Sequence, residues 1–298
     1  MRVLVFGSTG QVAHELSRAA WPKETALTFL DRRAADLSQP QTLGAIVRAH
    51  APDAVVIAAG YTKVDAAASD ETMAHAVNAK GPAAIARATA ELSVPVIYLS
   101  TDYVFDGAKN GFYDEDDPVS PLNAYGRSKA AGEKQVRAAN PKHMILRTSW
   151  VYSAHGANFL LAMLKRAKEA REVRIVADQR GCPTAASDLA AAIAQAAPLL
   201  VAGRGAFGTF HAAGSSDTTW HGFAEAIFSA LQARGLPRPK NLPISTADYP
   251  TPAKRPQNSR LSSARFAKAF GITLRGYAEA MPSVLDEAHS ALPAGATR

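Results

Sequence analysis

The 298-residue sequence contains a single cysteine, Cys182. One thiol cannot form an internal disulfide, and it leaves no group of cysteines that could hold a zinc ion. A disulfide scaffold and a cysteine-based zinc site are therefore excluded, and a reducing compartment is expected. We interpret Cys182 as a small buried apolar side chain, because no neighbouring base is indicated that would activate it.

The sequence also lacks a long apolar run. Its first residues, MRVLVFGSTG, are interrupted by Gly7 and are too short for the hydrophobic region of a signal peptide. No later segment approaches the ~20 apolar residues of a membrane-spanning helix. We therefore expect a cytoplasmic protein without a membrane partner. The eight histidines show no ligand spacing such as HxxxH, so no metal site is predicted from them.

Blocks of one charge sign are absent as well. The chain has 33 Lys+Arg against 26 Asp+Glu, a formal net charge of +7, but the two signs are interspersed along most of its length. No basic stretch with interleaved aromatic residues occurs, which argues against a nucleic acid or a membrane surface as the partner. Binding of an acidic small molecule explains part of the excess of basic residues, since a mildly basic surface attracts anions.

Short apolar runs alternate with longer helical patterns through the first half of the chain. Hydrophobic residues make up 47% of the sequence, enough for a substantial core. Strands are expected at residues 2–6, 26–30, 54–59, 96–100 and 144–148, and helices at 11–20, 41–50, 71–92 and 122–139. Strands that are apolar throughout are typical of a sheet covered on both faces. We therefore predict an α/β fold with a doubly wound parallel (Rossmann) sheet.

The boundary residues of the last of these helices are distinctive. Ser120 and Pro121 predict its N-cap and first position, and Asn140 with Pro141 predicts its end. The later part of the chain has shorter units. Helices are expected at 158–170, 187–201 and 220–234, strands at 173–176 and 208–214, and a final pair of helices after a proline-rich stretch at 237–256. The tail after Ala288 is predicted to fray.

The length favours two unequal lobes, because single cores stop growing near ~250–300 residues. Residues 1–150 are expected to form a nucleotide-binding domain that contains the catalytic residues. Residues 151–298 are expected to form mainly a smaller, mixed α/β substrate lobe, with some segments returning to the first domain.

The segment GSTGQVA, residues 7–13, lies where the first strand turns into the first helix. A dinucleotide pyrophosphate needs a tight turn, a close approach to the backbone and free N–H groups at a helix N-terminus. Gly7 and Gly10 meet the first two needs, and Ala13 replaces a third glycine where only helix packing is required. The glycines alone indicate a turn; with the strands that follow, they predict a nucleotide site.

Charged residues follow the second strand. Asp31 stands where a carboxylate can bind the adenosine ribose, which favours NAD, whereas Arg32 and Arg33 could pair with the 2′-phosphate of NADP. Both NADH and NADPH therefore stay open, as does the alternative of a solvated loop. Asp36 and Leu37 could offer adenine a hydrogen-bond acceptor and an apolar wall.

The clearest chemical pattern is STDYVFDG at residues 100–107, followed by SPLNAYGRSKAAGE at 120–133. Tyr125 and Lys129 are one helical turn apart, so their side chains share one face. Reduction of a ketone needs an acid beside the oxygen, and a nearby ammonium is expected to lower the pKa of the phenol. Thr101, at the end of the fourth strand, can donate a second hydrogen bond to the developing oxyanion.

Together with RTSWVY (147–152) and YPTPAKRPQNSRL (249–261), these segments resemble the dTDP-4-dehydrorhamnose reductases, a family of extended short-chain dehydrogenase/reductases. The similarity runs from residue 1 to at least 285. It implies NAD(P)H-dependent reduction of the C4 keto group of dTDP-4-dehydro-L-rhamnose. The alternatives are a reductase of another nucleotide-4-keto-sugar and a non-catalytic NADP-binding regulatory subunit.

The resemblance and the patterns above assign the site residues. The catalytic residues are Thr101, Tyr125 and Lys129, with Tyr125 as the proton donor. The cofactor-binding residues are Gly7, Gly10, Gln11, Val12, Asp31, Arg32, Asp36, Leu37, Gly60, Tyr61, Thr62, Tyr125 and Lys129. The substrate-binding residues are Thr101, Asp102, Tyr125, Trp150 and Arg255.

Two of these assignments have structural alternatives, and one expected ligand is doubtful. Trp150 could instead be an anchor between the lobes, and Arg255 a solvated loop cation. Some family members bind Mg²⁺ at a dimer interface through glutamates. Glu15 is present here, but Ser187, followed by Asp188, occupies the second position, so no metal is included in the predicted site. A homodimer is kept as a hypothesis.

Overall fold

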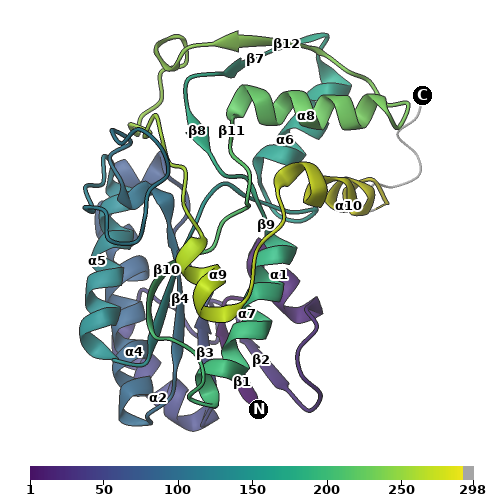
Figure 1. Ribbon diagram of the computed structural model, residues 1–298. Helices are drawn as coiled ribbons and strands as arrows, with labels where there is room; N and C mark the ends of the chain where they lie inside the picture. The colour runs from purple at the N-terminus through teal and green to yellow at the C-terminus, as the bar shows by residue number, and fades with distance from the viewer. Residues whose placement is uncertain (291–298) are drawn as a thin grey trace.

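The computed structural model describes residues 1–290. Its centre is a six-stranded, all-parallel sheet in the order β10-β5-β4-β3-β1-β2 (Figure 1). The strands are β1 (Arg2–Phe6), β2 (Ala26–Leu30), β3 (Ala54–Ile57), β4 (Val96–Thr101), β5 (His143–Thr148) and β10 (Gly208–His211). The third strand ends earlier than predicted because the amides of Ala58 and Ala59 both turn to the Phe6 carbonyl.

Helices cover both faces of this sheet. One face packs against α1 (Gln11–Arg18), α7 (Ala186–Val201) and α9 (Ala264–Phe270); the other packs against α2 (Pro40–His50), α4 (Gly81–Glu91) and α5 (Ala124–Ala139). Leu16, Ile193 and Phe266 are fully buried on the first face, as are Ile85 and Val136 on the second. The predicted doubly wound parallel sheet is confirmed.

The prediction of one continuous helix at 71–92 is wrong in the middle of that range. The chain forms α3 (Glu71–His75), a π-helical segment η2 (Ala76–Lys80) and then α4. Pro82 has no amide hydrogen to donate to the carbonyl of Asn78, and that carbonyl instead accepts a 2.6 Å hydrogen bond from the Tyr98 hydroxyl. The π-helical turn aims the Asn78 side chain at the loop after β3.

The predicted start of α5 is also corrected. Ser120 and Pro121 remain in the preceding loop, where the Ser120 amide donates to the Val104 carbonyl. Asn123 is the N-cap, because its backbone is extended and its Oδ1 accepts a 2.8 Å hydrogen bond from the Gly126 amide. The predicted end at Asn140 is confirmed.

Most of the later elements form a second layered unit above the sheet (Figure 1). Its helices α6 (Phe159–Glu169), α8 (Trp220–Gln232) and α10 (Tyr277–Ser290) share one apolar core. Three strand pairs accompany them: β7 (Glu172–Val176) with β12 (Lys240–Ile244), β6 (Val151–Tyr152) with β9 (Thr184–Ala185), and β8 (Arg180–Gly181) with β11 (Thr218–Thr219). Short helical turns complete the chain: η1 (Ala66–Ala68), η3 (Asp102–Val104) and η4 (Thr246–Asp248).

Strand β12 lies in the proline-rich stretch and was not predicted. It tolerates Pro243 because it pairs only with β7, so the missing amide hydrogen is not needed by a second neighbour. The residues of the predicted frayed tail beyond α10 lie outside the described part of the chain. Within residues 1–290, no helix combines the length and the apolar character that crossing a bilayer requires.

Candidate active site

The carboxyl ends of β1 and β3 lie side by side at the point where the strand order reverses. Such a switch point is where open α/β sheets bind their ligands. Gly7 follows β1 with a φ of +109°, and a side chain there would lie 3.0 Å from the Ala59 amide nitrogen. Gly10 precedes α1 without a side-chain cap, and a Cβ added to it would meet nothing within 4 Å. This open helix N-terminus fits a dinucleotide pyrophosphate.

The next two residues of α1 have side chains turned away from that opening. Gln11 Oε1 accepts 3.0 Å hydrogen bonds from Ser153 Oγ and Asn158 Nδ2, both in the second lobe. Val12 packs against the core beneath the sheet. Both residues can therefore serve the predicted nucleotide site through their backbone amides.

The predicted adenosine end is largely open to solvent. Asp31 is exposed and accepts a 2.8 Å hydrogen bond from the Ala34 amide. The Arg32 side chain is 76% exposed and lies 3.2 Å from Asp36, whose pKa is lowered chiefly by the Ser38 amide. Leu37 is 5% exposed and packs in the core, so little of its side chain is accessible for the apolar wall predicted for adenine.

The loop after β3 is fixed by Asn78, a residue that the sequence did not single out. Its side chain accepts from the Tyr61 amide at 2.8 Å and donates to the Tyr61 carbonyl and to Ser128 Oγ. A Cβ on Gly60 would lie 3.1 Å from Asn78 Oδ1 and 4.0 Å from Lys129 Nζ, whereas Thr62 is exposed. The predicted cofactor loop therefore lies directly beside α5.

Thr101 and Tyr125 come together where β4 ends and α5 begins. Thr101 is 6% exposed and caps η3 by accepting from the Tyr103 amide at 3.2 Å. The Tyr125 and Tyr103 rings meet edge to face at 5.9 Å between centroids. Burial raises the pKa of Tyr125 to about 12; a hydrogen bond with Thr101 lowers it and the charge of Asp102 raises it further.

Lys129 lies one turn after Tyr125 and is 5% exposed. Its Nζ donates to the Leu99 carbonyl and lies 4.1 Å from the centroid of the Tyr98 ring. Burial lowers the pKa of Lys129 to about 7, although Glu133 opposes the change. The expected lowering of the Tyr125 pKa by this ammonium is not found: burial of the phenol dominates, and Lys129 is not among the groups that shift the Tyr125 pKa.

Asp102 and Trp150 lie nearby but in different environments. Asp102 accepts hydrogen bonds from Thr101 Oγ1 at 3.0 Å and Ser149 Oγ at 3.2 Å, and burial raises its pKa to about 6. The Trp150 ring stacks on Trp220 of α8, with centroids 3.5 Å apart and planes at 6°. A Cβ on Gly181 would lie 2.4 Å from Trp150 Cε2, so this geometry favours the interlobe anchor over an indole open to a sugar.

Arg255 is held by an ion pair and is not a free surface cation. Its guanidinium binds both carboxylate oxygens of Asp65, at 3.1 and 2.8 Å. Next to it, the Lys254 carbonyl accepts a 2.8 Å hydrogen bond from Asn123 Nδ2 at the start of α5. The C-terminal segment around residue 255 therefore lies against the start of α5.

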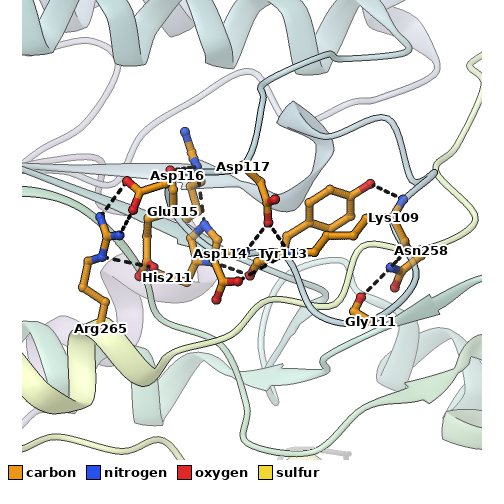
Figure 2. A network of polar contacts seen from close by, with 11 residues as sticks. Lys109, Gly111, Tyr113, Asp114, Glu115, Asp116, Asp117, His211, Asn258 and Arg265 are labelled. Carbon is orange, nitrogen blue, oxygen red and sulfur yellow. Dashed lines mark hydrogen bonds and ion pairs between the residues drawn. The ribbon is translucent and has the colours of Figure 1, made fainter.

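A polar network holds the loop that connects η3 to α5 (Figure 2). Arg265 of α9 pairs with Asp116 and Glu115, and Glu115 Oε1 accepts from the His211 amide at 2.9 Å. Earlier in the loop, the Lys109 and Gly111 carbonyls accept hydrogen bonds from Asn258 Nδ2 of the C-terminal segment at 2.6 and 2.7 Å. The loop is thus tied to the sheet edge and to the C-terminal segment.

Known proteins match this chain over most of its length. The family model described as "RmlD substrate binding domain" matches residues 1–290. A dTDP-4-dehydrorhamnose reductase of Sinorhizobium fredii is 46% identical, with 94% of this chain and 95% of the relative covered, and one of Escherichia coli is 39% identical, with 96% and 98% covered.

A solved structure agrees with these relatives. The dTDP-4-dehydrorhamnose reductase of Bacillus anthracis, crystallised in complex with NADP, is 32% identical and superimposes with a TM-score of 0.88, covering 96% of this chain and 99% of its own. The fold, the order of the motifs and the extent of these matches lead to one conclusion: the chain belongs to the dTDP-4-dehydrorhamnose reductase family.

Proposed function

We propose that this protein reduces the C4 keto group of dTDP-4-dehydro-L-rhamnose to give dTDP-L-rhamnose, with NADPH or NADH as the cofactor. The observation that supports this most directly is the placement of Thr101 at the end of β4 and of Tyr125 and Lys129 on α5, with Lys129 Nζ beside the Gly60 loop. Relatives at 46% and 39% identity are named for this activity.

The reduced nicotinamide dinucleotide, when bound, supplies the hydride. Tyr125 then donates its phenolic proton to the substrate oxygen, since a pKa of about 12 keeps the phenol protonated at neutral pH. The Thr101 hydroxyl gives the same oxygen a second hydrogen bond. Lys129, whose pKa of about 7 leaves about half of it protonated at neutral pH, stabilises the remaining phenolate in its charged form, and its position beside Gly60 suits contact with the nicotinamide ribose.

We infer the remaining roles from position. The turn at Gly7, Gly10, Gln11 and Val12 receives the pyrophosphate through its backbone; Asp31, Arg32 and Asp36 meet the adenosine; and Gly60, Tyr61 and Thr62 border the nicotinamide half. Asp102 meets the sugar, and Arg255 lies toward the diphosphate. Burial of Asp102 and the ion pair of Arg255 with Asp65 mean that each substrate contact replaces an existing protein contact.

We further propose that residues 1–150 bind the cofactor and that the later lobe binds the dTDP-sugar. The separate apolar core shared by α6, α8 and α10 supports this assignment of the two ligands to two parts of the chain. A cytoplasmic location agrees with the lone, buried Cys182. A homodimer remains part of the proposal, to be checked by light scattering.

The experiment is a direct turnover assay. Purified protein is mixed with NADPH and freshly prepared dTDP-4-dehydrorhamnose; we expect loss of NADPH absorbance and a product that co-elutes with dTDP-L-rhamnose. A dTDP-4-keto sugar with the other configuration at C5 serves as the control substrate. Equal turnover of both would favour a different nucleotide-sugar reductase, and NADP binding without turnover would favour the regulatory subunit.

A further inference from the structure

Tyr98 lies in the middle of β4 and has no part in the chemistry described so far. It is fully buried on the sheet face that packs against α4 and α5. Lys129 Nζ lies over the face of its ring, 4.1 Å from the centroid. The Tyr98 hydroxyl donates a 2.6 Å hydrogen bond to the Asn78 carbonyl. One buried side chain therefore contacts both the active-site lysine and the π-helical turn next to the cofactor loop.

The Lys129 ammonium has few partners that compensate for its burial. It is 5% exposed, and within residues 1–290 its Nζ donates to the Leu99 carbonyl and takes part in no ion pair. Glu133, one turn later on α5, pairs with Arg147 instead. The face of an aromatic ring is negative and attracts a cation most strongly where water is excluded. The Tyr98 ring therefore offsets part of the cost of burying this charge.

The Tyr98 hydroxyl completes the hydrogen bonding of the π-helical turn. Pro82 has no amide hydrogen to give to the Asn78 carbonyl, and a buried carbonyl without a donor is costly. Gly132 of α5 leaves room for the hydroxyl, because a Cβ there would overlap the Asn78 carbonyl oxygen and lie 2.6 Å from the Tyr98 hydroxyl oxygen. The Asn78 side chain in turn binds the Tyr61 amide. The hydroxyl thus supports the loop after β3.

We propose that Tyr98 is a positioning residue for the reduction: its ring holds the Lys129 ammonium in place and in its charged form, and its hydroxyl holds the Asn78 turn beside the cofactor loop. This inference rests on the proposed function, in which charged Lys129 stabilises the Tyr125 phenolate. Tyr98 acts through these two neighbours, since it is itself fully buried within the sheet.

Other groups that carry charge or titrate belong to the elements around Lys129. They are Tyr125 and Glu133 of α5, Arg147 of β5, Asp102 of η3 and Tyr61 of the loop after β3. Asp102, with a pKa of about 6, affects the acid side of a pH profile. Loss of charge from Lys129 is therefore read on the alkaline side, and the variants below leave all these groups in place.

The test separates the ring from the hydroxyl. Tyr98→Phe keeps the ring and removes the hydroxyl, whereas trifluorinated phenylalanine at the same position keeps the shape and removes the negative ring face. Relative to Tyr98→Phe, the fluorinated variant should move the alkaline limb of the kcat profile down by about one pH unit and lower kcat at pH 7 about fivefold. Tyr98→Phe should leave this limb in place but raise the KM for NADPH about fivefold, because the Asn78 carbonyl loses its donor.

The control is Tyr152→Phe, at a fully buried tyrosine in the core of the second lobe, which should change neither the limb nor the KM. Carbon-13 NMR of the lysine side chains of the full-length protein, with Lys129→Arg to assign the signal, follows the Lys129 titration without turnover. Absence of turnover in the native protein would refute the proposed function, and the NMR titration would still test Tyr98.

The two halves of the proposal fail separately. The same Lys129 titration midpoint in Tyr98→Phe and in the fluorinated variant would overturn the role of the ring. An unchanged KM for NADPH in Tyr98→Phe would overturn the role of the hydroxyl.

Discussion

The ends of β4 and β2 lie on the same edge of the sheet but differ in how fully the protein itself buries and binds the side chains there. At the end of β4, Thr101 and Lys129 are about 95% buried and bound to protein groups. At the end of β2, Arg32 is 76% exposed, and among residues 1–290 its one polar partner is Asp36. The buried end, at β4, is thus organised before any ligand binds. The exposed end, at β2, where adenosine is predicted to bind, has solvated charges that a cofactor must order.

The largest expected effect comes from removing the proton donor at the buried end. Tyr125→Phe should lower kcat by about 10²–10⁴-fold, the range for loss of a general acid. Because the ring and its packing remain, cofactor affinity should change little. Steady-state kinetics and fluorescence titration with NADPH measure the two quantities, and unchanged kcat would remove Tyr125 from its role.

The buried ion pair next to Lys129 should be the main determinant of stability at this end. Glu133 and Arg147 are each 2% exposed, with Nη2 2.7 Å from Oε2. Glu133→Gln should lower the free energy of unfolding by about 3–5 kcal/mol, because it leaves a buried guanidinium unpaired.

The matched control for that variant is Glu71→Gln, in the exposed pair with Arg127, which should cost less than about 1 kcal/mol. Urea unfolding compares the two. Similar losses in both variants would contradict the contrast between buried and exposed charges.

Asp102 gives the buried end a distinct pH dependence. Its folded pKa of about 6 lies above the ordinary aspartate value of 3.8, so its contribution to stability is full below pH 3.8 and is lost as the pH rises through 6. Asp102→Asn should therefore be more stable than the native protein by about 3 kcal/mol at pH 8, and the gap should close near pH 3.8. A gap that stays constant across this range would show that the carboxyl does not titrate as described.

The smallest effect is expected at the exposed end. Arg32→Ala should raise the KM for NADPH a few-fold, about 1 kcal/mol, and leave that for NADH nearly unchanged, because only NADPH has the 2′-phosphate. Arg48→Ala, at an exposed arginine of α2 paired with Glu91, is the control. If Arg32→Ala leaves the ratio of the two KM values unchanged, the adenosine end does not select the cofactor through this residue.

Residues whose partners are close in sequence were predicted well. Tyr125 and Lys129 share one helix, and the strand at 2–6 matches its apolar run. Cys182 is fully buried, as expected, and burial raises its pKa to about 12. The pKa of Tyr125 could not be predicted in the same way, because its burial depends on elements that the sequence does not place.

Features that depend on distant partners were missed. Ser120 and Asn123 are both good N-caps, and the bond of Asn123 to Lys254 helps to distinguish them only in the folded chain. Asn78 stands in an alanine-rich helical pattern, where its poor helix propensity was the only signal of its role. His14 and His155 meet because α1 packs against the second lobe, which no local pattern could indicate.

The bond between Asn123 and Lys254 also has a consequence for synthesis. The residue that begins the catalytic helix depends on a carbonyl 131 positions later in the chain. A ribosome therefore releases the whole of α5 long before it makes the segment that fixes the start of that helix. Chains truncated before residue 254 would contain Thr101, Tyr125 and Lys129 but lack this restraint, so we expect the start of α5 to be fixed only late in synthesis.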